Sequence, residues 1–321
     1  MDGSRRLLTM ALPIAGVLGL IAWLGTPGLS GQDRRDDRDR RAVVDDDRDE
    51  NDHDGPPPLL HFGVTGDTRP PTVNDVNNYP TAIITSIADR FQASAVQFVV
   101  ETGNHSYANS LQSAQVQMAL YTQATKHFAN PWYLSEGNHD CWNQPTALCL
   151  PGSQAPSFLA FMQALAPVSR VPYYTFHVRT PHGRATFVVI AGNSWDATQA
   201  AWLEKTLAIA DRNAKYTMVV SNHPLDDAFF PPAGAISAIV RQHKFALFMS
   251  DSLAMYRHHP NARDFILGLG GAPLANGQGF YGYGIVDQLS SGRLQVSIFD
   301  LRSGNIVGAW TALPNDDDDS R

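Results

Sequence analysis

The sequence predicts an α/β fold with a parallel core and an added antiparallel meander. Between residues 59 and 269, short apolar runs typical of buried strands alternate with segments of helical periodicity, which predicts parallel strands joined by helices. After residue 281, three apolar runs follow one another with only Gly-containing turns between them, which predicts antiparallel strands. Most early strands also end in Gly or a polar residue, and open α/β sheets place their sites at such ends.

The elements follow from local periodicity and from turn residues between the runs. We expect strands at residues 59–64, 96–100, 132–134, 173–178, 185–191, 217–220, 245–249, 265–269, 281–286, 294–299 and 306–310. We expect helices at residues 80–91, 107–128, 157–165, 199–210 and 235–241. In the first helix, for example, Ile83, Ile84 and Ile87 fall on one face.

The N-terminal segment differs in composition from the rest of the chain. Two arginines precede an uncharged stretch over residues 7–32, whose apolar part has the features of a secretory signal peptide cleaved before Gly31. Because the stretch is close to the length that spans a bilayer, an uncleaved membrane anchor is the alternative. With residues 1–31 as signal peptide or anchor, we expect an exported protein. It would be periplasmic, extracellular or anchored on the outer side of a membrane, and would contact the membrane only through this segment.

Two further segments are too charged to fold. Residues 32–58 are rich in Asp and Arg and predict a disordered tether, and residues 314–321 predict an acidic disordered tail. The net charge of −7 comes from these ends, because residues 55–314 contain 15 Asp and Glu residues and 15 Lys and Arg residues. We therefore expect one neutral domain over residues 59–313 and no nucleic-acid partner.

Two cysteines lie directly after the sequence GNHD. In an exported protein, we expect Cys141 and Cys149 to form a disulfide that holds the loop beside His139 and Asp140. The alternative, a metal or redox pair, lacks the close spacing that such sites use.

Polar side chains that can bind a metal or an anion occur at five strand ends. They are Asp67, Asn104, Asn138, His223 and Asp251. A generic α/β protein also has polar strand ends, but it rarely collects these residue types at successive ones. We therefore expect the five residues to converge at one rim of the sheets.

These motifs resemble the calcineurin-like metallophosphoesterase superfamily, and in particular its purple acid phosphatases. The matching segments, in family order, are Gly66-Asp67, Gly103 to Asn109, Gly137 to Asp140, Val220 to His223, and Phe248 to Tyr256. The resemblance covers nearly all of residues 59–313. It implies two stacked mixed β-sheets flanked by helices.

The chain departs from the family pattern at the metal ligands. Asn104 stands where the family has the Asp that bridges two ions, and Asp251 and Leu253 replace two histidines. Where many members have a histidine two residues after the first Asp, this chain has Arg69. The resemblance therefore implies one divalent ion, Zn, Mn or Fe, in place of two.

The resemblance also assigns roles to individual residues. The metal ligands that it implies are Asp67, Asn104, Tyr107, Asn138, His223 and Asp251. His139 would act as general acid or transition-state stabiliser, and Arg69 would face the phosphoryl oxygens. The alternative is a metal-free fold in which these polar residues bond one another.

Three functions remain open. The first is an exported, metal-dependent hydrolase of phosphoesters with reduced activity, which intact GNHD and His223 favour. The second is a non-catalytic protein that binds a phosphate-bearing ligand or a surface partner, which Asn104 and Leu253 favour. The third is an inert domain displayed on a tether.

Overall fold

The computed structural model describes residues 56–315 apart from residues 143–147, 150–151, 229 and 252. The predicted signal segment, the tether up to residue 55 and the tail from residue 316 lie outside the described residues. Within the part of the chain that is described, no helix combines the length and the apolar character needed to cross a membrane.

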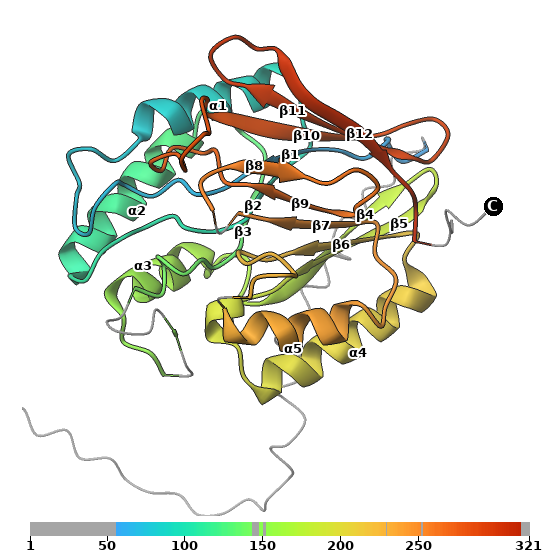
Figure 1. Ribbon diagram of the computed structural model, residues 1–321, viewed down its shortest axis with the longest axis horizontal. Coiled ribbons are helices and arrows are strands. Elements are labelled where there is room, and N and C mark those ends of the chain that lie inside the picture. Colours follow the sequence, from blue (N-terminus) through green and yellow to red (C-terminus); the bar gives the residue numbers. More distant parts are fainter. Residues whose placement is uncertain (1–55, 143–147, 150–151, 229, 252, 316–321) are drawn as a thin grey trace, which may run out of the picture. The chain divides into compact units, whose positions relative to one another are not determined.

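The described chain forms two six-stranded mixed sheets (Figure 1). In spatial order, sheet one contains β12 (Ile306–Ala312), β11 (Leu294–Asp300), β10 (Gly282–Gln288), β1 (His61–Thr65), β2 (Val99–Glu101) and β3 (Trp132–Leu134). Sheet two contains β4 (Tyr174–Thr180), β5 (Gly183–Val189), β6 (Tyr216–Val220), β7 (Leu247–Ser250), β9 (Asp264–Leu267) and β8 (Tyr256–His258). The predicted fold of two stacked mixed sheets is confirmed.

Each sheet has a parallel part that directs its strand ends to one edge. In sheet one, β1, β2 and β3 are parallel, and the meander β10–β12 pairs antiparallel with β1. In sheet two, β5, β6, β7 and β9 are parallel, with β4 and β8 antiparallel at the edges.

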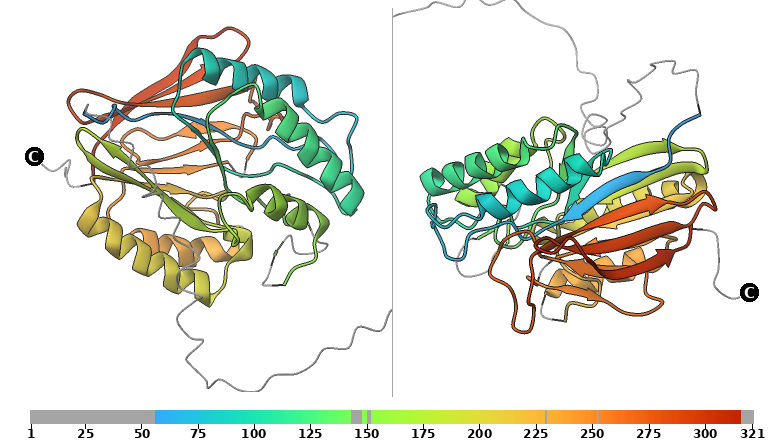
Figure 2. Two further views of the ribbon diagram at one scale, coloured as in Figure 1. Left: turned by 180° about the vertical axis from the view of Figure 1, so that it is seen from behind. Right: turned by 90° about the horizontal axis from the view of Figure 1, so that it is seen from above.

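Helices cover the outer faces of the sheets (Figures 1 and 2). They are α1 (Thr81–Ala93), α2 (Leu111–Thr125), α3 (Pro156–Leu165), α4 (Ala197–Asn213), α5 (Pro231–Val240) and the short 3-10 helix η1 (Gly192–Ser194). On sheet one, Ile87 and Phe91 of α1 pack with Val99 of β2. On sheet two, residues of α4 and α5 pack with the outward side chains of β5, β6 and β7.

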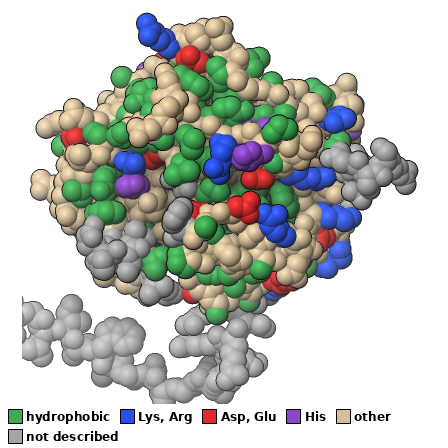
Figure 3. Space-filling view, viewed as in Figure 1, with side chains coloured by type: hydrophobic (Ala, Val, Ile, Leu, Met, Phe, Trp, Pro, Cys, Tyr) green, Lys and Arg blue, Asp and Glu red, His purple; other side chains and the backbone are tan. Residues whose placement is uncertain are grey.

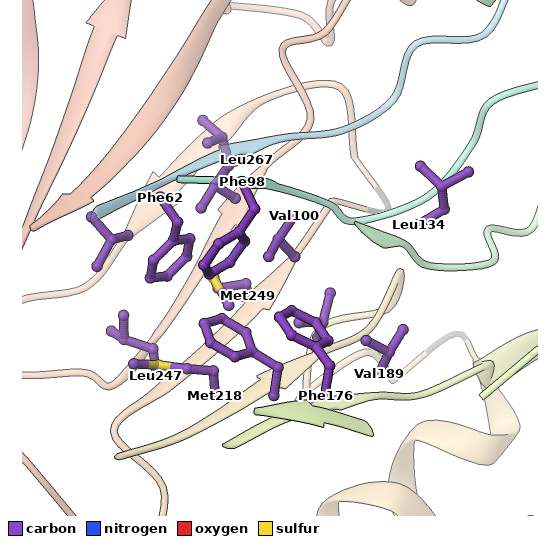
Figure 4. Close-up of a cluster of buried hydrophobic side chains, with 14 of the residues drawn as sticks. Phe62, Phe98, Val100, Leu134, Phe176, Val189, Met218, Leu247, Met249 and Leu267 are labelled. Carbon is purple, nitrogen blue, oxygen red and sulfur yellow. The ribbon is translucent and has the colours of Figure 1, made fainter. Parts of the chain in front are cut away.

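Aromatic and aliphatic side chains fill the space between the two sheets (Figure 4). Phe62 and Phe98 of sheet one lie against Phe187 of sheet two, with ring centroids 5.1 and 5.3 Å away. Complete burial of one such side chain contributes about 1.5–3 kcal/mol. This packing fixes the strand ends of one sheet relative to those of the other, which a site shared by both sheets requires.

Several elements differ from the sequence-based expectation, among them α2, the strand β8, the helix α5, which begins at Pro231, and the 3-10 helix η1. The helix expected from residue 107 begins at Leu111, because the Ser110 side chain accepts a hydrogen bond from the Ser113 backbone N–H and caps the helix there. Tyr107 therefore lies in a loop. The strand β8 was not predicted, because three residues at a sheet edge carry too little periodicity to be recognised.

Candidate functional site

Loops from both sheets meet where the parallel strands end. The Asn138 backbone N–H donates to Asn222 Oδ1 at 3.2 Å, and Asn222 Nδ2 donates to Asp251, so the loops after β3, β6 and β7 are joined. Asp251 also lies against Gly66, where a Cβ atom would collide with its carboxylate. The structure thus brings the loops after β1, β3, β6 and β7 to one rim.

Two site residues have left-handed backbone conformations. Asp67 has φ 58° and Asn104 has φ 65°, each two or three residues after its strand ends. The Asp67 N–H donates to the Gly103 carbonyl at 3.0 Å, which couples the two turns. Asp and Asn tolerate this region better than other non-Gly residues, and such conformations concentrate at functional sites.

Gly137 allows the β3 loop to approach the β2 loop closely. A Cβ atom at this position would lie 2.7 Å from Asn104 Cγ, closer than real Cβ contacts allow. The Gly in GNHD is therefore needed for contact between the two loops.

Asp140 is a buried anion that holds the two loops together. Its carboxylate accepts hydrogen bonds at 2.9–3.0 Å from four backbone N–H groups, those of Asn104, His105, Ser106 and Gly137. Its other donors are the Ser106 hydroxyl and His105 Nδ1, both at 3.1 Å. Burial alone would raise the pKa of Asp140, but His105 and the backbone N–H donors lower that pKa below its ordinary value. Asp140 therefore positions the loops as a charged carboxylate and is not itself accessible.

A second buried network lies behind Asp140. His105 Nε2 lies 3.7 Å from Glu101 Oε1, and Glu101 accepts hydrogen bonds from the Tyr121 and Thr68 hydroxyls. Burial lowers the pKa of His105, but the charges of Asp140 and Glu101 outweigh it, so the pKa is raised overall. The raised pKa favours the protonated imidazole, whose positive charge offsets two buried carboxylates.

Asp67 is paired with Arg69 at the rim. Arg69 Nε lies 3.1 Å from Asp67 Oδ1, and the Arg69 side chain is 15% exposed. Burial raises the pKa of Asp67 to about 6, although Arg69 and a hydrogen bond with Asn104 oppose the rise. The guanidinium thus provides a positive charge beside a residue that the sequence predicted to bind a metal.

The Asn104 amide is engaged by protein groups. Its Oδ1 accepts the His139 backbone N–H at 2.9 Å, and the amide also hydrogen-bonds Asp67. A carboxylate at this position would accept from His139 but could not donate to Asp67. Asn104 therefore suits this loop contact, and its predicted role as a metal ligand stays a prediction.

Asp251 is fully buried beside other acids. Burial, with the charges of Asp67 and Glu101, raises the pKa of Asp251 well above its ordinary value. In the absence of a cation, the raised pKa favours the neutral form of this carboxyl group. Asn222 supports it through the hydrogen bond described above.

His223 is oriented by an acidic residue one helical turn later in the chain. Its Nδ1 lies 2.9 Å from Asp227 Oδ2, its Nε2 lies 3.1 Å from Asn193 Oδ1, and Phe230 stacks on the ring. A carboxylate on one ring nitrogen is typical of metal-binding histidines, because it fixes the tautomer. Here the other nitrogen faces the Asn193 amide, so metal binding would require that contact to break.

Arg69, Asn138, His139, Tyr107 and Trp142 form the partly exposed surface of the rim. The Tyr107 ring lies 4.4 Å from the His139 ring and 4.9 Å from that of Trp142, with the Arg69 guanidinium 5.6 Å from its centre. Burial, aided by the charge of Arg69, lowers the pKa of His139 to about 3. His139 is therefore neutral at physiological pH and can donate a hydrogen bond, but it is a poor proton donor.

Cys141 and Cys149 are joined by a disulfide with Cα atoms 5.3 Å apart. Glu136 Oε1 lies 2.6 Å from Cys141 Sγ, and burial raises the pKa of Glu136 well above its ordinary value. Among the described residues, Glu136 and these cysteines are the only three His, Cys or acidic side chains whose ligand atoms gather within 4.8 Å. Because the disulfide uses both sulfurs, this group is no thiolate metal site.

The rim carries groups that could hold a divalent ion, although Asp67, His223 and Asp251 do not bring three ligand atoms within 4.8 Å of one another. Asn138 Oδ1 is a buried polar atom without a hydrogen-bond partner, and the two acids Asp67 and Asp251 have raised pKa values. A cation would satisfy both conditions. Leu253, at a position where the resemblance implies a histidine, is 44% exposed and offers no ligand atom.

Several residues of the site were not identified from the sequence. They are Glu101, Thr102, His105, Glu136, Asn193, Asn222 and Asp227. One signal was available, because His105 and Asn222 lie within matched motifs, and Glu101 and Glu136 lie within two residues of one. Their roles depend on tertiary partners, which a single sequence does not show.

No family model matches the chain, and no curated protein sequence matches it. Solved structures do match. Purple acid phosphatase PPD1 from yellow lupin (Lupinus luteus) seeds superimposes with a TM-score of 0.60 at 15% identity, over 80% of this chain and 54% of that chain. GAP50, the anchor in the inner membrane complex of Plasmodium, superimposes with a TM-score of 0.59 at 13% identity, over 81% of this chain and 90% of that chain.

A dimetal phosphatase from Danio rerio superimposes with a TM-score of 0.54 at 13% identity, over 80% of this chain and 99% of its own. These likenesses show that the chain has the calcineurin-like metallophosphoesterase fold, which confirms the resemblance in the motifs at the level of fold. The similar structures include both phosphatases and an anchor.

Proposed function

We propose that this chain is an exported phosphoester hydrolase that uses one divalent ion and has reduced activity. One observation carries the proposal. Two buried acids with raised pKa values, Asp67 and Asp251, lie at the same rim as the unpartnered Oδ1 atom of Asn138. Burying two such acids close together without a cation lowers the stability of the fold, and a bound cation would offset that loss.

The ligands that we propose are Asp67, Asn138, His223 and Asp251, and the ion is Zn, Mn or Fe. A bound divalent ion would supply Lewis-acid polarisation and an activated water. The chain itself would bind the phosphoryl oxygens through Arg69, which is partly exposed and already oriented by Asp67. His139, neutral at physiological pH, would donate a hydrogen bond to the same group.

Export is part of the proposal. The disulfide between Cys141 and Cys149 supports it, since disulfides persist in oxidising compartments. The apolar stretch at residues 7–32 supports it independently.

The test combines elemental analysis of the purified chain with hydrolysis of p-nitrophenyl phosphate. We expect about one ion per chain and slow hydrolysis that His139→Ala lowers while metal content stays the same. Tight binding of two ions with rapid turnover would contradict the one-metal proposal. Hydrolysis unaffected by His139→Ala would show that the activity arises elsewhere.

A non-catalytic protein that binds a phosphate-bearing ligand is the second candidate. The Asp67–Arg69 ion pair and the Asn104–His139 hydrogen bond favour it, because they give Asp67 and Asn104 protein partners without a metal. Inorganic phosphate binding by metal-free protein, lost in Arg69→Gln and without hydrolysis, would select this candidate.

A further inference from the structure

The edge opposite the rim carries a basic residue on five neighbouring strands of sheet two. Each lies within three residues of the strand end at this edge, and we call the set the basic row: Arg179, Arg184, Lys215, Lys244 and Arg263. Pairing places Arg179 beside Arg184, and the next pair of strands aligns Ala185 with Tyr216, so Arg184 is followed by Lys215. The row thus crosses β4, β5, β6, β7 and β9 in order.

Two acidic residues, Asp211 and Asp264, lie beside the basic row. Asp211 accepts the Lys244 backbone N–H at 2.9 Å and pairs with His243 at 2.7 Å, and Asp264 follows Arg263 in the chain. Figure 3 shows Lys and Arg side chains gathered at the right-hand side of the molecule. Since residues 55–314 are neutral overall, this is a local excess of positive charge.

A hollow adjoins the row between the two sheets. It encloses about 750 Å³, and its lining includes Arg263, Arg293, His258 and Trp310 but no acidic residue. Its wall also includes Ala312 and Leu313, at the end of β12. The chain therefore passes along this basic hollow just before the described part ends.

Asn315 fixes the point from which the next residues continue. Its backbone N–H donates to the Lys215 carbonyl at 3.0 Å, and its side chain bonds the Thr217 N–H at 2.8 Å and the Ala214 carbonyl at 3.1 Å. The side chain is buried. The chain thus reaches the middle of the basic row in a defined position.

The next four residues are all aspartates, Asp316 to Asp319. Four extended residues span about 13 Å. Neighbouring strands lie about 4.8 Å apart, so β5 and β7 are both within reach from β6.

We propose that Asp316–Asp319 bind the basic row of their own chain and cover it. The four carboxylates complement the row in charge, and Asn315 holds them at a high local concentration. The occupant is thus the chain itself, and an external polyanion would bind here only after displacing it. This inference is independent of the proposed chemistry at the rim.

The direct test is carbodiimide cross-linking of the full chain, which joins a carboxylate to an amine only in close contact. We expect cross-links from Lys215 or Lys244 to Asp316–Asp319, which disappear at about 1 M salt because screening weakens exposed ion pairs. Mixing ¹⁵N-labelled and unlabelled chains separates cross-links within one chain from those between copies. No cross-link to these aspartates, or cross-links only between copies, would overturn the proposal.

A second test measures whether the row is covered. The variant with Asp316–Asp319 all changed to Asn should elute from heparin at higher salt than the unaltered chain. The matched control changes Asp45, Asp46, Asp47 and Asp49 to Asn, which alters the net charge equally at another place in the sequence. An equal shift in the control would show an effect of net charge alone and overturn the proposal. Adding Arg184→Gln, Lys215→Gln and Lys244→Gln to the first variant should abolish its shift.

Discussion

Two buried aspartates at the same rim have opposite properties. Asp140 accepts hydrogen bonds from six donor groups, and its pKa is lowered. Asp251 is equally buried, but it lies among other acids and its pKa is raised well above the ordinary value. Burial is the same in both cases, so the surrounding donors and charges decide whether a buried carboxyl group is an anion that stabilises the loops or an acid that needs a cation.

The largest expected effect on stability comes from a substitution of Asp140. Asp140→Asn places an amide N–H₂ group among N–H donors, and we expect a loss of about 3–5 kcal/mol in the free energy of unfolding. The matched control, Asp251→Asn, replaces a carboxyl group whose raised pKa favours its neutral form with a neutral amide of the same shape, and should change stability by less than about 1 kcal/mol without metal. Urea unfolding of both variants is the measurement. Equal losses would show that the two aspartates do not differ as described.

The pH dependence of stability sharpens the comparison. Asp67 has a pKa of about 6 in the folded chain and an ordinary value of 3.8, so between these values the folded state retains a proton that the unfolded state releases. Stability should therefore fall as pH rises from about 4 to about 6, by on the order of 3 kcal/mol. The pKa of Asp140 is lowered, so its contribution to the stability of the fold is fully present at pH values above 3.8. That contribution is lost only as the pH falls below this value.

The measurement is chemical unfolding between pH 4 and pH 8 for the unaltered chain and for Asp67→Asn. The variant should show a flatter profile, and added Mn²⁺ should stabilise the unaltered chain more at high pH than at low pH. An identical profile in the variant would contradict the raised pKa of Asp67.

A smaller effect is expected at Asn104. Asn104→Asp keeps the acceptor for the His139 N–H, but it removes the donor to Asp67 and adds a negative charge, so we expect a loss of about 1–2 kcal/mol without metal. The lost stability should return with Mn²⁺ or Zn²⁺ in thermal unfolding. Combined with Leu253→His and Asp251→His, the change should raise the metal content towards two. A loss that metal does not restore would show that the position cannot serve an ion.

The smallest effect is spectroscopic. With a pKa of about 3, the His139 ring should show no titration between pH 5 and pH 8 in NMR spectra. Arg69→Gln should raise this pKa, while burial, the larger cause, should keep it below 6.5. A midpoint near 6.5 in the unaltered chain would contradict the described environment.

The sequence predicted the sheets and the strand-end residues because both depend on local patterns. Apolar runs bounded by turn residues identified every strand except β8, and the order of motifs indicated the fold. The partners within the site depend on contacts between distant residues. Asn222 and Asp251, for example, are 29 residues apart and belong to loops of different strands. No periodicity encodes that pairing.

The resemblance to metal sites also could not show which partner each side chain contacts. Asn104 and His223 fill expected ligand positions, yet the structure gives their side chains protein partners. Arg69 likewise pairs with Asp67. Burial of an unpaired carboxylate is unfavourable, and Arg69, two residues later in the chain, provides the opposite charge.

The position of β1 in sheet one determines when the chain can finish folding. β1 lies between β2 and β10, and its antiparallel register aligns His61 with Asp287. A ribosome that has made only the first half of the chain has therefore produced a strand with one unpaired edge, and unpaired edges promote association between chains. Closing so long a loop is slow relative to local pairing. In the exported form that we propose, β1 would pair with β10 only after almost the whole chain has crossed the membrane.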